Sequence, residues 1–108
     1  MVDSHKIIEK VETGVFIERI KYLKKEDVEV SDHAVFRVKK AERKAFKDEI
    51  IDILLHENPL LVGIQRNKNY AVYYKYKSDT LKMILDMTPK SIKVVTVYIV
   101  DNKQVPRL

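Results

Sequence analysis

The sequence predicts an α+β fold, with helices in the first half of the chain and a four-stranded antiparallel meander in the second half. Apolar residues recur every three or four positions before Pro59 and alternate with other residues after it, which are the periods of helices and strands. The connections after Pro59 are short and rich in turn residues. With 108 residues there is room for one domain, 1–108. We expect the helices to cover one face of the sheet and leave the other partly open.

The first 30 residues are expected to form a helical extension. From about residue 4 to residue 25 the apolar spacing is that of an amphipathic helix, which Gly14 could divide into two. Residues 26–30 are predicted to be a short acidic connector. Ser31 and Asp32 then offer side-chain oxygens that can cap a following helix.

That following helix is predicted over residues 33–47, which hold six basic residues and one acidic residue. A helix would place four polar side chains on one stripe, beside a stripe of small apolar residues that can lie against the sheet. The four are His33, Arg37, Lys40 and Lys44. Either the helix runs through Lys47, or a turn near Asp48 begins a second helix that ends at Asn58-Pro59, because proline cannot continue a helix.

Four strands are predicted after Pro59, over residues 60–65, 70–77, 81–87 and 92–100. In the second strand Lys75 shares a face with Tyr73. The fourth strand is apolar on both faces, as in a central or covered strand, with Val94, Thr96 and Tyr98 on one of them. Residues 101–108 show no periodicity and are expected to be a mobile tail.

Several classes of protein are disfavoured. The chain has no cysteine, which excludes disulfides and thiolate metal sites and fits a cytoplasmic location. Its first residues contain no apolar segment of the kind found in signal peptides, and it has no apolar run long enough to cross a membrane, so we expect a soluble protein that does not bind a membrane. The three histidines are far apart without spaced acidic partners, so no metal site is expected. No cofactor is expected either, because the sequence has no glycine-rich phosphate loop.

The net charge of +5 is unevenly distributed. Residues 1–57 hold twelve Lys or Arg and thirteen Asp or Glu, whereas residues 58–108 hold nine and three, so the two halves contribute −1 and +6. A one-sided positive surface favours polyanions, which makes nucleic acid the leading class of partner. A lysine-rich surface that only maintains solubility explains the charge about equally well.

The residues best suited to chemistry are His33 and the basic residues that follow it. RNA cleavage without a metal needs a group that takes the 2′-hydroxyl proton, cations for the phosphate, and an acid for the leaving oxygen. In the structural alternative, His33 lies at a helix start, Arg37 pairs with a carboxylate such as Glu42 or Asp32, and the lysines are solvated. Spacing alone favours this alternative.

Two segments carry a resemblance to a known family. Ser31-Asp32-His33-Ala34-Val35-Phe36-Arg37 and the closing Val95-Thr96-Val97-Tyr98 resemble a family of small prokaryotic proteins with a His-Ala-x-x-x-Arg segment and a closing Val-Thr-Val-Tyr strand. That family is similar to RelE-like and BrnT-like toxins, whose fold, shared with barnase-type and colicin-type ribonucleases, is a helical layer on an antiparallel sheet. The resemblance covers about residues 31–101.

The resemblance implies a RelE-like fold, a metal-independent endoribonuclease of a toxin–antitoxin pair, and an antitoxin protein as partner. It gives catalytic roles to His33 as proton-transfer group, Arg37 as phosphate binder and Tyr98 as acid or base. The expected RNA-binding residues are Lys40, Arg43, Lys44, Thr96 and Lys75. The family's second arginine follows the first by four residues, where this chain has Ala41, so Arg43 or Lys44 would fill that role.

Two other functions stay open. One is a non-catalytic member of the same fold that binds nucleic acid. The other is a protein-interaction module, including a homodimer that forms through residues 1–30. Binding of RNA without cleavage would favour the first, and a dimer lost on removal of that segment would favour the second.

Overall fold

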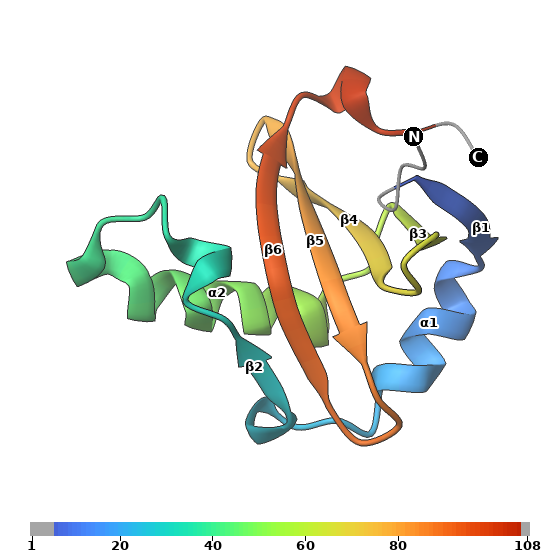
Figure 1. Ribbon diagram of the computed structural model, residues 1–108, viewed down its shortest axis with the longest axis horizontal. Coiled ribbons are helices and arrows are strands. Elements are labelled where there is room, and N and C mark those ends of the chain that lie inside the picture. The colour runs from blue at the N-terminus through green and yellow to red at the C-terminus, as the bar shows by residue number, and fades with distance from the viewer. Residues whose placement is uncertain (1–5, 107–108) are drawn as a thin grey trace.

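The computed structural model describes residues 6–106, and the protein it shows is an α+β structure with one six-stranded mixed sheet (Figure 1). The strand order is β1-β3-β4-β5-β6-β2, and neighbouring strands are antiparallel except for β2 and β6, which are parallel. The elements, in chain order, are β1 (Ile7–Val11), α1 (Thr13–Ile20), β2 (Val28–Val30), α2 (Arg43–His56), β3 (Leu61–Gln65), β4 (Tyr70–Tyr76), β5 (Asp79–Met87) and β6 (Ile92–Val100).

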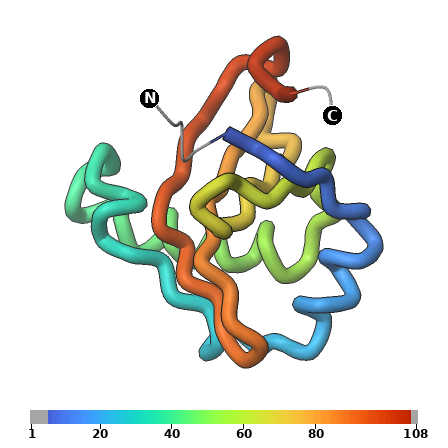
Figure 2. The backbone as a smooth tube through the Cα atoms, turned by 45° about the vertical axis from the view of Figure 1, so that its right-hand side comes forward, coloured from blue at the N-terminus to red at the C-terminus, as the bar shows by residue number. Residues whose placement is uncertain are grey.

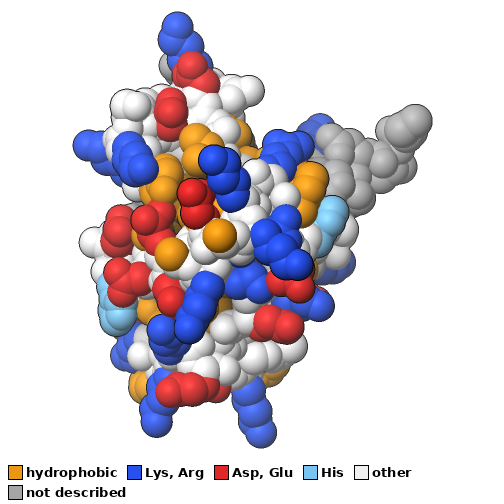
Figure 3. All heavy atoms as spheres, turned by 90° about the vertical axis from the view of Figure 1, so that its left-hand side faces the viewer, with side chains coloured by type: hydrophobic (Ala, Val, Ile, Leu, Met, Phe, Trp, Pro, Cys, Tyr) orange, Lys and Arg blue, Asp and Glu red, His pale blue; other side chains and the backbone are white. Residues whose placement is uncertain are grey.

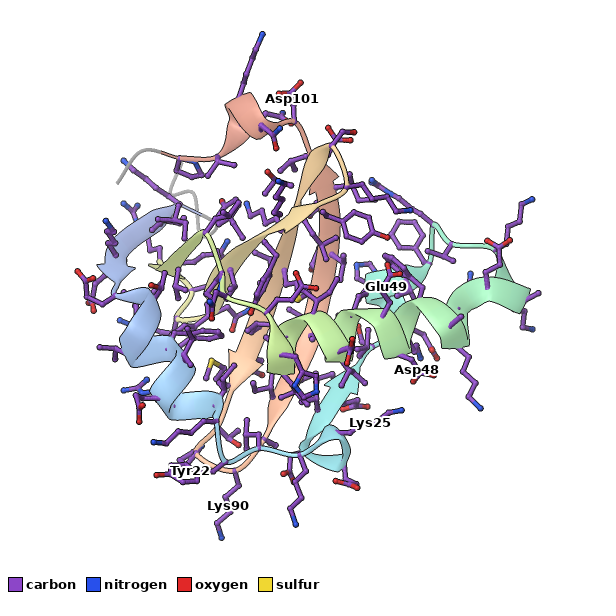
Figure 4. All side chains as sticks on the ribbon, turned by 180° about the vertical axis from the view of Figure 1, so that it is seen from behind. Tyr22, Lys25, Asp48, Glu49, Lys90 and Asp101 are labelled. Atoms are coloured by element: carbon purple, nitrogen blue, oxygen red, sulfur yellow. The ribbon has the colours of Figure 1, made fainter. Side chains whose placement is uncertain are left out.

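Both helices pack on the same face of the sheet. Figure 4 shows α2 crossing this face, and α1 lies beside it over β3. Phe16 of α1, Leu54 of α2 and Leu81 of β5 are fully buried in the core between helices and sheet. On the opposite face the described residues form a smaller buried cluster, Leu61, Ala71, Tyr73 and Ile84, against which Val105 packs. Within the described residues, no helix is both long and apolar enough to cross a membrane.

The predicted fold, N-terminal helices on a four-stranded antiparallel meander of RelE-like type, is wrong. The four expected strands are present as β3 to β6, but two further strands flank them and one of these, β2, is parallel to its neighbour. Residues 7–11, expected as helix, form β1, and residues 28–30, expected as connector, form β2. Both are short and pair with strands more than fifty residues away, and such pairing leaves no local signal in the sequence. Residues 1–5 of the expected extension lie outside the described residues.

The predicted basic helix over residues 33–47 is also wrong. His33–Val35 and Lys40–Glu42 are single turns of 3-10 helix, and the backbone of Lys39 between them is not helical (φ −54°, ψ 136°). The α-helix begins only at Arg43, so the expected stripe of four polar side chains does not exist. A continuous helix is interrupted between the two turns, because the carbonyl groups of Phe36 and Val38 accept hydrogen bonds from the Arg43 side chain instead of from helical amides.

A bulge in β6 changes which residues share a face. Leu85 pairs with Val94 and Ile84 pairs with Thr96, so Val95 is an extra residue between them. Val94 therefore packs in the core beneath the helices, while Thr96 lies on the opposite face with its cross-strand partner Ile84. The prediction that Val94 and Thr96 share a face is wrong, because strict alternation cannot anticipate a bulge.

The segment after β6 contacts the β4–β5 turn. The hydroxyl of Thr80 donates to Oδ1 of Asn102 at 2.7 Å, and Nδ2 of Asn102 donates to the carbonyl of Ser78 at 3.0 Å. A 3-10 turn over Asn102–Gln104 follows, capped by Asp101. Residues 107 and 108 of the expected mobile tail lie outside the described residues.

Candidate functional site

A pocket of about 410 Å³ lies between β6 and the segment 33–38. Figure 2 shows this segment following β2 along the side of β6. Four of the eight residues that the sequence singled out line the pocket: His33, Arg37, Thr96 and Tyr98. The structure therefore brings together residues that are about sixty positions apart in the chain.

The pocket's first wall is held against β6 by backbone contacts. The N–H of Ser31 donates to the carbonyl of Val94 at 3.0 Å, which extends the β2–β6 pairing by one residue. The N–H of Ala34 then donates to Oγ of Ser31 at 3.1 Å and begins the turn. Because Ala34 and Val35 are buried, the neighbouring side chains, His33 among them, are left at the surface.

Three exposed side chains form the mouth of the pocket. The rings of His33 and Phe36 stack with centroids 5.3 Å apart and an interplanar angle of 19°. The guanidinium carbon of Arg37 lies 5.4 Å from the centre of the Phe36 ring. Phe36 thus keeps a histidine and an arginine together, and cation–π attraction favours this arrangement.

The structural alternative for Arg37, pairing with Asp32 or Glu42, is not what the structure shows. Asp32 pairs instead with Lys47, with 2.6 Å between Oδ1 and Nζ. The hydrogen bond from Lys47, assisted by its charge, lowers the pKa of Asp32. Within residues 6–106, Arg37 has no carboxylate partner, and no Asp or Glu lines the pocket. The positive charge of Arg37 is therefore available to a ligand.

Arg43 does not line the pocket but binds the backbone of its first wall. Its Nε donates to the carbonyl of Val38 and its Nη2 to the carbonyl of Phe36, both at 3.0 Å. These bonds hold the backbone on either side of Arg37. The guanidinium is thereby occupied by the protein itself, so its expected role as a phosphate ligand stays a prediction without support from its contacts.

The other three predicted basic residues lie outside the pocket lining. Lys40 and Lys44 are exposed on the 3-10 turn and the first turn of α2. Lys75 is exposed on β4, where it lines two other surface hollows near the β4–β5 turn. Their side chains add positive charge to the surface without contacting the pocket.

The second wall of the pocket is β6, where Tyr98 provides a hydroxyl and lies beside Lys82. Tyr98 pairs across the sheet with Lys82, whose Nζ lies 5.9 Å from the centre of the Tyr98 ring and 5.6 Å from that of Tyr73. Tyr98 is 40% exposed, whereas Tyr73 is buried. Of the two, only Tyr98 can meet a ligand.

Sequence reasoning missed the apolar part of the site. Phe36, Val38, Phe46, Val97 and Ile99 complete the pocket walls. Figure 3 shows the corresponding side of the molecule, where hydrophobic side chains are exposed among charged side chains of both signs. Phe36 gave one usable signal, because it is a large apolar residue between His33 and Arg37 in the segment that carries the resemblance. Among the described residues, no three His, Cys, Asp or Glu are placed to hold a metal ion.

Comparisons with protein-family models, with curated proteins and with solved structures find no match to this chain.

Proposed function

We propose that the pocket between β6 and residues 33–38 binds RNA and cleaves it without a metal ion. One observation supports this most strongly: His33, Arg37, Thr96 and Tyr98 line one pocket. They provide an imidazole, a guanidinium and two hydroxyls within reach of one ligand.

The proposed reaction is attack of a ribose 2′-hydroxyl on the adjacent phosphorus. The imidazole of His33 takes the 2′-hydroxyl proton, and a bond forms between the 2′-oxygen and phosphorus. The bond to the 5′-oxygen of the next nucleotide breaks, and that oxygen receives a proton from the hydroxyl of Tyr98. The products are a 2′,3′-cyclic phosphate and a free 5′-hydroxyl. Solvent then restores the proton of Tyr98 and removes the one on His33.

Arg37 is proposed to hold the phosphate during this reaction. A guanidinium can donate two parallel hydrogen bonds to phosphate oxygens and stabilise the charge that develops on them. No Asp or Glu among residues 6–106 lines the pocket, which favours an anionic ligand over a cationic one. Thr96 offers a further hydroxyl donor.

A second candidate is RNA binding without cleavage. His33 stacks its ring on Phe36, and no hydrogen bond orients the imidazole within the described part of the chain. Catalytic histidines are commonly oriented by such a bond. An exposed Phe beside cations is, in contrast, a good platform for stacking an unpaired base.

The proposal includes the partners and location that the sequence suggested. RNA is the proposed ligand, and a cytoplasmic location belongs to the same proposal. An antitoxin protein and a homodimer follow from the resemblance and from the N-terminal segment respectively, and neither is needed for the chemistry at this pocket.

Cleavage is tested with a single-stranded RNA and the purified full chain in excess EDTA. The variants are His33→Gln and, as matched control, His56→Gln, which alters an exposed histidine at the far end of α2. We expect the parent and the His56→Gln variant to produce 2′,3′-cyclic phosphate ends, and the His33→Gln variant to be slower by ~10²-fold or more.

The same assay separates the two candidates. If RNA binds the parent but is never cut, the protein is the binding module of the second candidate. If His33→Gln cuts as fast as the parent, or if an oligonucleotide lacking every 2′-hydroxyl is cut equally well, the proposed chemistry is wrong.

A further inference from the structure

The outer edge of β6 is paired along only part of its length. β2 pairs with Ile92, Lys93 and Val94, and the N–H of Ser31 makes the last bond, to the carbonyl of Val94. Within residues 6–106 no strand pairs with this edge from residue 95 to residue 100. In Figure 1 the upper part of β6 accordingly lies at the border of the sheet. The 3-10 turn His33–Val35 contacts β6 beside this edge, but no described residue makes a backbone hydrogen bond to the edge between residues 95 and 100.

The other edge of the sheet is protected in ways that this one is not. At β1 the register shifts between Ile7 and Glu9, and exposed charged residues, Glu9 and Lys10, stand on the strand. Bulges and charges of this kind prevent other chains from pairing with an edge. Residues 95–100 contain no charged residue, and Ile99 is 57% exposed. An exposed apolar edge in one half of one strand indicates an interaction surface.

We propose that the open edge of β6 binds an extended acidic segment of another protein as an added strand. Main-chain hydrogen bonds to residues 95–100 would provide the pairing, and alternate side chains of the segment would point into the pocket beside Phe36 and Ile99. The proposal needs only the free edge and the pocket, and does not rest on RNA cleavage.

Charge selects the partner. Arg37 lines the pocket without a carboxylate partner among the described residues. A glutamate or aspartate side chain of an added strand would meet its guanidinium. A second copy of this chain would instead bring two positively charged molecules together, with a net charge of +5 on each copy. An acidic segment is therefore the favoured occupant.

The test uses the ¹⁵N-labelled full chain and a blocked eight-residue peptide in which Val and Thr alternate with Glu. We expect shifts of amide signals concentrated in residues 95–100 and 33–38, and slower hydrogen exchange of β6 amides in the complex. Ile99→Asp should weaken binding by roughly tenfold, which corresponds to ~1.4 kcal/mol. Ile8→Asp is the matched control, because Ile8 is a 51% exposed isoleucine on the opposite edge strand, and it should change affinity by less than about twofold.

Two peptide controls test the mode of binding. The same peptide N-methylated at alternate residues cannot donate along one edge and should not bind, and the same peptide with Lys in place of Glu should bind at least about tenfold more weakly. Equal binding by the N-methylated peptide would overturn strand addition, and equal binding by the Lys peptide would overturn the acidic partner. Signal shifts confined to β1, or a dimer of the unliganded chain that pairs β6 with β6, would overturn the proposal as a whole.

Discussion

Arg43→Ala is predicted to loosen the wall of the pocket. In the parent, the guanidinium bridges the carbonyls of Phe36 and Val38 with two bonds of 3.0 Å. A bond from a charged donor contributes about 1.5–3 kcal/mol when buried, but one of these bonds is exposed and the other only partly buried. Water can replace part of what is lost, so we expect the free energy of unfolding to fall by ~1–2 kcal/mol for the pair. For a chain of this length that corresponds to a Tm lower by roughly 4–8 °C.

The measurement is thermal unfolding of the parent, Arg43→Ala, Arg43→Lys and Arg66→Ala. Lysine can reach at most one of the two carbonyls, so Arg43→Lys should recover less than half of the lost stability. Arg66 is exposed on the β3–β4 turn and controls for loss of an arginine charge. The amide signals of residues 36–38 should move in the Arg43 variants alone. If Arg43→Ala unfolds within about 1 °C of the parent and leaves those signals in place, the bridge does not hold the wall.

Further predictions concern the packing of β1 on β3, helix α1 and the dependence of stability on pH. A Cβ at Gly63 would lie 2.6 Å from Cγ2 of Ile7, so Gly63→Ala should displace β1 and lower the free energy of unfolding by ~1–3 kcal/mol. A Cβ at Gly14 would meet nothing within 4 Å, so Gly14→Ala should stabilise α1 by ~0.5–1 kcal/mol. Urea unfolding of both variants checks these opposite signs, and equal signs would contradict them. The Glu49 carboxylate accepts a hydrogen bond from Tyr76 and raises the pKa of Tyr76 from 10.0 to about 12. Because this folded-state pKa is raised, the stability from the bond is complete below pH 10 and lost as the pH rises towards 12. The stability difference between the parent and Tyr76→Phe should shrink over that interval, and a constant difference would refute the assignment.

The second half of the fold was predictable because alternation is a strong local signal. β3, β4 and β6 differ from their predicted ranges by one residue or less at each end, and β5 begins two residues early. In the first half, Ile7 and Val11 have a spacing that fits a helix as well as a half-exposed edge strand. In the structure this segment is a strand, because it pairs with β3. Such pairing depends on distant residues and is not visible locally.

The candidate site was predictable in its residue types but not in its geometry. His33 and Arg37 were expected to meet on one stripe of a helix, yet they meet on the two sides of a 3-10 turn, with Phe36 between them. The parallel pairing of β2 with β6 is what places this turn beside Thr96 and Tyr98. That pairing could not be predicted, because a three-residue strand with two valines is too short to give a clear strand pattern in the sequence.

RNA is proposed to occupy the pocket between β6 and residues 33–38. The most direct measurement follows the amide signals of the ¹⁵N-labelled full chain during titration with a 2′-O-methylated RNA oligonucleotide, which cannot be cleaved. We expect the largest shifts at residues 33–38 and 96–99, and their loss in Arg37→Glu. Largest shifts around Lys75 and Lys77 at the end of β4, unchanged by Arg37→Glu, would contradict it.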